Sequence, residues 1–482
     1  MRKEKDTSKL PSECTTIIVG DKQTADGSRI LARSSDFDAM MAINFEVHKD
    51  TDFGPKEFIA KDSAFRCPLP EKALGYTGLP DFQFPGEWGS AGFNSAGVGE
   101  SSTETIFSSA KALQFDPYVP DGLAENCTYN IVLPYIHTAR EGVERLGSLI
   151  EQYGSAEGFG IGFIDDKEVW YLENACGHHW LATRIPRGHY FVTGNQSRYR
   201  RYDPEDKENF LASKGLIEFA IEHGLYDPAQ GEFDFHEAFS HDGKDEERDD
   251  TTYNYPRVWG LQAMFSPSLP NDVTKNTFPV FAKAEEKFTI PKLRTAFRFH
   301  YNGTEHDPYL HQNGKEPYRP VSIFRTTQTH IMQVRPDLPK EIGEITYVAL
   351  GMADLGVFLP LYQGVKSFPK AYSKGNGHAD DKSAYWRFRK VMTLGMVNYN
   401  KYAPIIKEAY DKLEAENDQR QKEMEEAYLK LYKKEPMKAL DLLQDFSDTI
   451  LNHALEVADD LVNELFTRLT YDIQQEYMFH GA

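Results

Sequence analysis

The amino-acid sequence predicts an α+β fold, and three observations support this class. A β-branched, apolar run at 14–20 and a second strand-like segment at 29–36 flank a turn-rich segment that contains Asp26-Gly27, which is typical of a β-hairpin. Further strand-like and helix-like segments follow without a regular βαβ alternation, so a doubly wound parallel sheet is not expected. Residues 396–482 carry two amphipathic stripes, which predict a helical hairpin.

The other elements are predicted from their own patterns. Strands are expected in four further segments, at 91–99, 158–165, 167–173 and 189–193. Apolar spacings of three and four predict a helix over 130–153, and Pro436 separates the two C-terminal helices. The polar segments 235–255 and 366–384 are expected to be surface loops. The helical hairpin is expected to support a homo-oligomer, although an acidic helical pair can equally cover its own domain.

Composition excludes several classes of protein. The chain has 482 residues, of which 40% are hydrophobic and 13% aromatic, so it has enough apolar material for a large core and is not a disordered chain. The formal net charge of −20 argues against binding to a nucleic-acid backbone, which needs clustered Lys and Arg. No run approaches the roughly 20 apolar residues that span a bilayer, so no membrane partner is expected.

The four cysteines indicate the compartment. They show no CxxC spacing, so neither a disulfide framework nor a cysteine-rich zinc site is expected. The first 13 residues are charged and lack the apolar core of a secretory signal. We therefore expect a cytoplasmic protein.

Two features that suggest a cofactor have a simpler explanation. The glycines of 158–163 (GFGIGF) miss the GxGxxG spacing, so they indicate a glycine-rich strand rather than a nucleotide loop. His178 and His179 are adjacent and would point to opposite faces of a strand, which does not favour a shared metal. We expect neither a metal nor an organic cofactor.

Cys14 is the strongest candidate nucleophile. A lone cysteine is usually a small buried hydrophobe, but this one opens an apolar strand directly after a short polar leader. Removal of residues 1–13 would make Cys14 the N-terminus, and its α-amine could then take the thiol proton. An α-amine of pKa about 8 and a thiol of about 8.5 are closely matched for this transfer.

The segment that contains Cys14 carries a resemblance to a known family. ECTTIIVGDKQTADGSRILARSSD resembles the N-terminus of the C69 family of cysteine dipeptidases. Four further segments agree in the same order: WGSAGFNSAGVGESSTET, HHWLATRIPRGHYFVTGNQSRYR, YNYPRVWGLQ and YRPVSIFRTTQTHI. The resemblance covers about residues 14–395.

The resemblance implies an N-terminal-nucleophile hydrolase with a four-layer αββα sandwich, made from a precursor by cleavage before the nucleophile. It implies three parts of the chain: a leader at 1–13, a catalytic domain at 14–395 and a C-terminal helical extension at 396–482. The wider superfamily includes conjugated bile salt hydrolases and penicillin V acylase.

The same resemblance implies the other residues of the site. An Arg-x-x-Asp pair on the next strand corresponds to Arg33 and Asp36, Asn195 corresponds to an oxyanion donor, and Arg257 to a further arginine of the site. Arg33 would stabilise the thiolate and Asp36 would hold the α-ammonium of Cys14. The alternative is that Arg33 and Asp36 form a surface ion pair worth about 0–1 kcal/mol.

Two assignments concern the substrate. Glu104 is expected to receive the ammonium of a dipeptide, and Arg257 its carboxylate. Glu104 also stands near the point where the bile salt hydrolases have a second asparagine, so the second oxyanion donor stays open and a backbone N–H could serve.

The sequence therefore predicts a cysteine-dependent dipeptidase of broad specificity. One alternative keeps the fold and nucleophile but acts on N-acyl amino acids or bile-salt-like amides. Another is a non-catalytic relative whose helical hairpin binds a partner protein.

Overall fold

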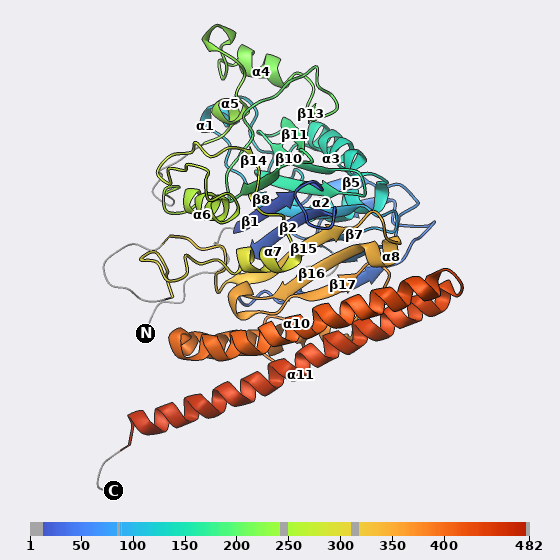
Figure 1. Cartoon of the computed structure of the whole chain (residues 1–482). Helices are drawn as coiled ribbons and strands as arrows, with labels where there is room; N and C mark the ends of the chain where they lie inside the picture. Colours follow the sequence, from blue (N-terminus) through green and yellow to red (C-terminus); the bar gives the residue numbers. More distant parts are fainter. Residues whose placement is uncertain (1–12, 84–86, 88, 242–248, 310–317, 479–482) are drawn as a thin grey trace.

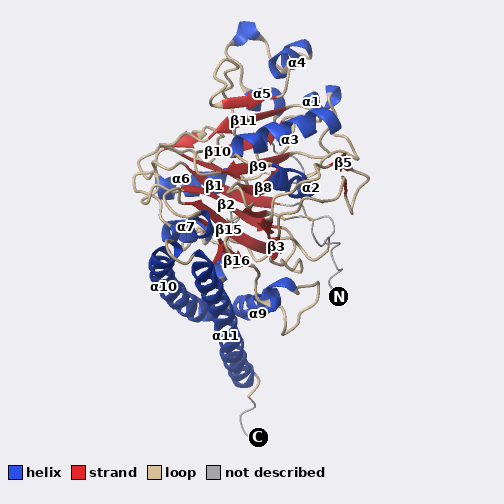
Figure 2. Cartoon of the chain, turned by 90° about the vertical axis from the view of Figure 1, so that its right-hand side faces the viewer, coloured by secondary structure: helices blue, strands red, loops and turns tan. Residues whose placement is uncertain are grey.

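Two antiparallel sheets lie face to face, and helices cover the outer face of each (Figures 1 and 2). The computed structural model describes residues 13–83, 87, 89–241, 249–309 and 318–478. Within these residues the order of layers is helix, sheet, sheet, helix, which is the predicted α+β sandwich.

The first sheet is the seven-stranded one and contains the predicted hairpin at its centre. Its strands run in the order β14 (Phe281–Ala282), β12 (Tyr190–Thr193), β1 (Glu13–Val19), β2 (Arg29–Asp36), β15 (Thr326–Val334), β16 (Glu344–Leu350) and β17 (Leu359–Tyr362).

The second sheet has six strands. They run in the order β13 (Phe210–Ala212), β11 (Trp180–Arg184), β10 (Val169–Asn174), β9 (Phe159–Ile164), β8 (Gly99–Thr105) and β7 (Ala91–Phe93). Two small ribbons pair β3 (Glu46–His48) with β6 (Tyr76–Gly78), and β4 (Glu57–Ile59) with β5 (Arg66–Pro68).

Helices form the outer layers. On the second sheet lie α2 (Glu125–Val132) and α3 (Ala139–Tyr153); on the first lie α6 (Tyr255–Phe265), α7 (Ile290–Phe297) and the long helices α10 (Tyr399–Tyr432) and α11 (Pro436–Glu476). The remaining α-helices are α1 (Ala110–Phe115), α4 (Leu216–Glu222), α5 (Phe235–Phe239), α8 (Lys340–Gly343) and α9 (Ala384–Val397).

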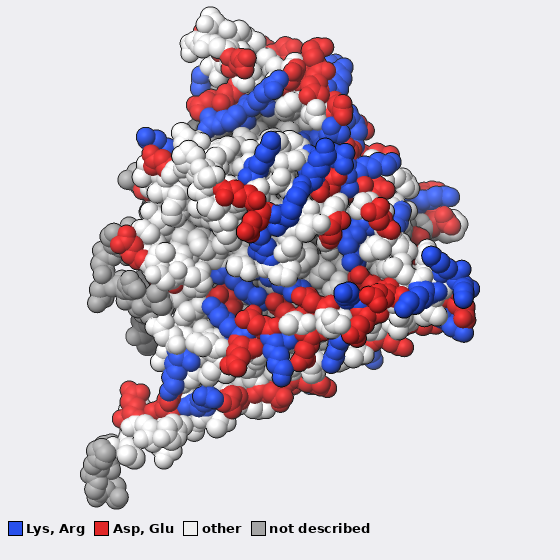
Figure 3. All heavy atoms as spheres, in the orientation of Figure 1, with Lys and Arg blue, Asp and Glu red and all other residues white. Residues whose placement is uncertain are grey.

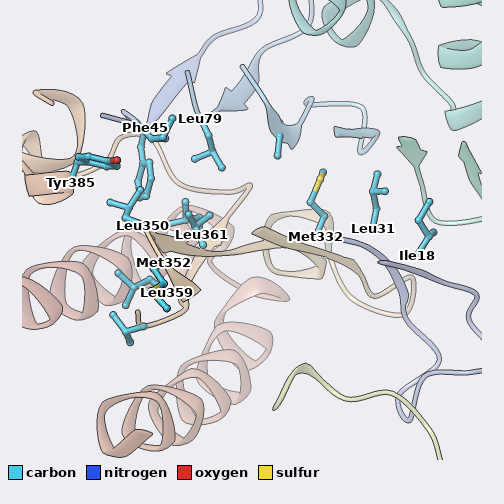
Figure 4. Packing of buried hydrophobic residues seen from close by; sticks show 14 of the residues in the cluster. Ile18, Leu31, Phe45, Leu79, Met332, Leu350, Met352, Leu359, Leu361 and Tyr385 are labelled. Atoms are coloured by element: carbon cyan, nitrogen blue, oxygen red, sulfur yellow. The ribbon is translucent and has the colours of Figure 1, made fainter. Parts of the chain in front are cut away.

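Both faces of β1 and β2 are buried, which fits the apolar end of β1 (Ile17–Val19) and the apolar residues 30–32 of β2. Ile18 and Leu31 pack with Met332 between the two sheets (Figure 4), whereas Ile17 and Val19 pack toward the outer helices. Because both sides of β1 are covered, the side chains at the start of this strand have fixed positions.

The glycine-rich strand β9 allows the sheets to approach closely. A Cβ at Gly162 would lie 2.6 Å from the Leu31 side chain of the facing sheet. This confirms the prediction of a glycine-rich strand at 158–163, with its glycines serving sheet packing.

Two predicted elements are divided in the structure. The helix expected at 130–153 is broken at Pro134 into α2 and α3, and Thr138 caps the new helix by accepting a hydrogen bond from the Glu141 amide. The strand expected at 91–99 ends at Phe93, and a turn with Gly97 at φ +94° separates β7 from β8.

The C-terminal hairpin packs on its own chain. Met424 and Tyr428 of α10, with Leu443 of α11, belong to the core that contains Tyr347 and Tyr362 of the first sheet. The last turns of α11 extend beyond the other elements (Figures 1 and 2). The hairpin thus covers part of its own sheet, as one of the two alternatives held.

On the face shown in Figure 3, acidic and basic side chains are interspersed. None of the described helices combines the length and the apolar character needed to cross a bilayer.

Candidate active site

Cys14 lies near the start of the central strand β1 and is completely buried. Cys14 is opposite Ser35 on β2, and Thr16, two residues further along β1, is opposite Arg33. Since residues two apart on a strand share a face, Arg33 and the thiol lie on the same side of the sheet, toward the second sheet.

The Arg33 guanidinium contacts the sulfur directly. Its Nε donates to Cys14 Sγ at 3.0 Å, and its Nη2 lies 3.3 Å from a carboxylate oxygen of Glu125 at the start of α2. Burial raises the pKa of the Glu125 carboxyl, and Arg33 partly offsets this shift. A guanidinium beside a thiol favours the thiolate, which is the reactive form.

Arg33 and Asp36 do not form the surface ion pair considered as the alternative. Both are buried, and each has another partner: Arg33 pairs with Glu125, whereas Asp36 accepts from Arg319 Nη2 at 2.6 Å and from Thr326 Oγ1 at 2.5 Å. The Asp36 position on β2 is opposite Glu13, the residue before the nucleophile.

Asn195 is oriented by two donors. Its Oδ1 accepts from the Cys14 amide at 3.4 Å and from Arg257 Nη2 at 2.9 Å. Its Nδ2 is buried and has no hydrogen-bond partner among the described residues. The side chain therefore presents a fixed donor beside Cys14, as an oxyanion hole requires.

Arg257 lies in the first turn of α6 and is fully buried. Each N–H group of its guanidinium is directed at an acceptor within the protein: the main-chain oxygens of Tyr253 and Cys14, and the side-chain oxygens of Thr15, Asn195 and Asn254. This geometry makes Arg257 a support for Cys14 and Asn195. The expectation that it receives the substrate carboxylate is not supported, because its donors are already engaged.

Gly194 and Asn254 determine how Arg257 packs against Asn195. Asn254 accepts from the Asn195 amide at 2.9 Å and donates to the Asn195 carbonyl at 3.1 Å. A Cβ at Gly194 would lie 2.8 Å from Arg257 Nη2, so this close approach requires glycine. Asn254 stands three residues before Arg257, a spacing that places both on one side of a helix start and could have identified it in the sequence.

The Glu104 assignment cannot be placed in the same way. Glu104 belongs to strand β8, and its side chain lies outside the described part of the structure.

All four cysteines are buried, and what distinguishes Cys14 is the Arg33 guanidinium that donates to its sulfur. Burial raises the pKa of Cys67 to about 11, and those of Cys127 and Cys176 further above their ordinary value. These three are therefore protonated and unreactive at neutral pH. Among the residues that the structure describes, no group of three or more His, Cys, Asp or Glu side chains could hold a metal ion.

Sequence reasoning missed Glu125, Arg319 and Arg325 as neighbours of the site. Arg319 and Arg325 lie in a segment that was already noted for its resemblance, but no local spacing connects them to Cys14. Only the pairing of β15 with β2 brings that segment beside Asp36.

A four-layer αββα sandwich with a cysteine at the start of a central strand, an arginine on its sulfur and an amide donor beside it is the arrangement of an N-terminal-nucleophile hydrolase. The chain belongs to peptidase family C69, which it matches over residues 13–412. It is accordingly a cysteine peptidase.

Similar proteins carry related names. A probable dipeptidase of Salmonella dublin is 49% identical over 365 residues, which cover 75% of this chain and 83% of the relative. Dipeptidase A of Lactobacillus helveticus is 33% identical, with 96% of this chain and 99% of the relative covered. A mutant conjugated bile acid hydrolase from Clostridium perfringens is 10% identical with a TM-score of 0.34, over 72% of this chain and 92% of its own, a likeness too low to support any conclusion.

Proposed function

We propose that this protein is a dipeptidase that uses Cys14 as an N-terminal nucleophile after residues 1–13 have been removed. The observation that carries the proposal is the convergence on Cys14 of the Arg33 guanidinium and the Asn195 amide, within a peptidase family whose relatives are named dipeptidases. The Glu13–Cys14 peptide bond, which must be cleaved, lies at the start of β1 beside Arg33 and Asn195.

Hydrolysis would proceed in two steps. The α-amine of Cys14 takes the thiol proton, and the sulfur attacks the peptide carbonyl of the dipeptide. Asn195 Nδ2 stabilises the oxyanion. The tetrahedral intermediate collapses to a thioester as the α-ammonium protonates the departing amine of the C-terminal residue. Water, deprotonated by the same α-amine, then attacks the thioester and releases the N-terminal residue and the thiol.

The surrounding residues have supporting roles in this scheme. Arg33 stabilises the thiolate, and Asp36, one position along β2 from the residue opposite Cys14, would hold the new α-ammonium. Removal of the leader would begin without this base, because the Cys14 nitrogen is still part of the peptide bond. The thiol of Cys14 would attack the carbonyl of Glu13, and the C–N bond would break as the nitrogen takes up a proton and becomes the α-amine. Water would then hydrolyse the thioester and release residues 1–13. Whether Glu104 binds the substrate ammonium is part of the proposal and has no further support from the described residues.

A comparison of free and blocked dipeptides tests the substrate class. We expect Ala-Ala to be hydrolysed and N-acetyl-Ala-Ala to be hydrolysed at least 100-fold more slowly, because a dipeptidase binds the free ammonium. The measurement is kcat/KM from the release of alanine. Equal rates on both substrates would favour the acylase alternative, and no hydrolysis of either would favour a non-catalytic relative.

We also propose a cytoplasmic homo-oligomer. The few, scattered cysteines fit a reducing compartment. The extending end of α11 exposes Phe466, Ile473 and Tyr477, whose spacing places them along one face of the helix. A second copy of the chain is the occupant that we assign to this face.

A further inference from the structure

The carboxylate of Glu13, the residue before the nucleophile, is held by two arginines. Glu13 forms an ion pair with Arg325, and its Oε2 lies 3.6 Å from Arg319 Nη2. The Glu13 side chain is only 10% exposed. We call Arg319 and Arg325 the carboxylate clamp.

The clamp is fixed by the protein independently of Glu13. Arg325 Nη1 donates to the main-chain oxygens of Asp36 at 2.9 Å and of Phe37 at 3.3 Å. Arg319 donates to the Asp36 carboxylate at 2.6 Å through Nη2 and to the Pro320 carbonyl at 2.5 Å through Nη1. Both guanidinium groups therefore keep their places at the end of β2 when the leader is gone.

Loss of the leader removes one of the two carboxylates that the clamp holds, while that of Asp36 stays. The Arg319 side chain is 8% exposed and that of Arg325 25%. Burial lowers the pKa of Arg325 to about 10, so the cation already bears a cost of desolvation. Withdrawing a carboxylate from such a group is unfavourable, and a new carboxylate restores the interaction.

We propose that the carboxylate clamp, occupied by Glu13 before processing, is the subsite that binds a carboxylate of the dipeptide afterwards. This inference rests on the proposed function. It replaces the expectation for Arg257, whose guanidinium is directed entirely at protein acceptors. A planar guanidinium suits the two oxygens of a carboxylate.

The clamp contacts Glu13, which is joined directly to Cys14 and carries the scissile carbonyl of the uncleaved chain. Adjacent residues of a strand point to opposite faces, so a substrate that touches both Cys14 and the clamp must cross the start of β1. Glu13 stands at this position in the uncleaved chain. In the uncleaved chain the side chain of Glu13 connects the scissile carbonyl to the clamp.

Two substrate carboxylates share this chemistry. An N-terminal glutamate would repeat the path of Glu13 atom for atom. The C-terminal carboxylate, which every dipeptide has, lies one bond closer to the scissile carbonyl. The clamp thus recognises either an acidic first residue or the common C-terminus, and the test separates the two.

The test compares wild type with Arg325→Gln on two pairs of substrates. The first pair is Ala-Ala and Ala-Ala amide, which differ in the C-terminal charge. The second pair is Glu-Ala amide and Gln-Ala amide, which differ in the side-chain charge. Intact mass first verifies that each protein begins at Cys14. Arg184→Gln is the matched control, because Arg184 is 29% exposed, pairs with Glu208 and lies on β11 of the second sheet.

We expect Arg325→Gln to lower one of the two charged-to-neutral ratios of kcat/KM by about 10-fold or more. A fall in the first ratio assigns the clamp to the C-terminus, and a fall in the second assigns it to an acidic first residue. The control variant should keep both ratios. If both ratios also stay unchanged in Arg325→Gln, the clamp does not bind substrate and the inference is wrong.

Two further observations keep the test decisive. If Arg325→Gln retains its leader, Arg325→Lys takes its place in the comparison, because it keeps the charge without the planar fork. One of the two charged-to-neutral ratios of kcat/KM should then fall, by a smaller factor than expected for Arg325→Gln. If wild type hydrolyses none of the four substrates, the proposed function fails. If wild type is active and the ratios do not move, only the clamp fails.

Discussion

Asn195 illustrates how single residues prepare the site. Its amide could turn either way in solution, but two donors hold Oδ1, so Nδ2 is left as the donor beside Cys14. The orientation costs nothing at the moment of reaction because it is fixed in advance.

Replacing Asn195 tests this role. We expect Asn195→Ala to lower kcat for Ala-Ala by about 10²–10³-fold with a small change in KM, because the lost interaction forms only in the transition state. Steady-state kinetics on the processed protein give both constants. Asn209→Ala removes an amide that donates to Asp206 at 2.8 Å and should leave kcat within about twofold. A pure rise in KM for Asn195→Ala would contradict the oxyanion role.

Glu100 on β8 provides a prediction about an element of the fold. Its side chain is fully buried, and burial raises its pKa from 4.5 to about 8. The folded chain therefore keeps a proton that the unfolded chain releases between about pH 4.5 and 8. Stability contributed by this proton is present at low pH and is lost as the pH rises.

We expect Glu100→Gln to raise the free energy of unfolding at pH 8 by an amount on the order of 1–3 kcal/mol and to change it little at pH 4.5. Urea unfolding of the purified protein at the two pH values gives the difference. Glu286→Gln, at a side chain that is 85% exposed, is the control and should show no such dependence. An equal effect at both pH values for Glu100→Gln would refute the buried titration.

The elements that sequence could predict are those set by local pattern. The strand at 29–36 was predicted with its bounds, and the β1 and β9 strands within one residue at each end. The prediction of one helix over 130–153 was wrong because the apolar period continues past Pro134, whereas proline interrupts the helical hydrogen bonding of the backbone.

Within the candidate site, sequence indicated Cys14, Arg33 and Asn195, which the structure brings together. It could not indicate Glu125 or Arg319, because their contacts join segments distant in sequence and depend on how β8, β15 and α2 pack. Asp36 is near Cys14 in the sheet, but its partner Arg319 was not foreseeable from any spacing.

At the scale of the whole molecule, the C-terminal hairpin has two different parts. Its inner stripe packs on the first sheet, and the end of α11 carries exposed aromatic side chains: Phe466 is 62% exposed and Tyr477 is 67% exposed. Exposed aromatic residues along one helix face are typical of a contact with another chain.

We expect the purified protein to be an oligomer and the double variant Phe466→Glu, Tyr477→Glu to lose it. Light scattering after size-exclusion chromatography measures the mass. Met437→Glu, at a side chain 63% exposed near the start of α11, should keep the assembly. A wild-type mass equal to that of one chain would contradict this part of the proposal.

The whole account depends on Cys14 becoming the first residue. Intact-mass analysis of active protein, combined with the dipeptidase assay, is its most direct test. We expect wild type to lose residues 1–13, and Cys14→Ala to keep them and to hydrolyse no dipeptide. Undiminished activity in protein whose residues 1–13 remain attached would contradict the N-terminal nucleophile.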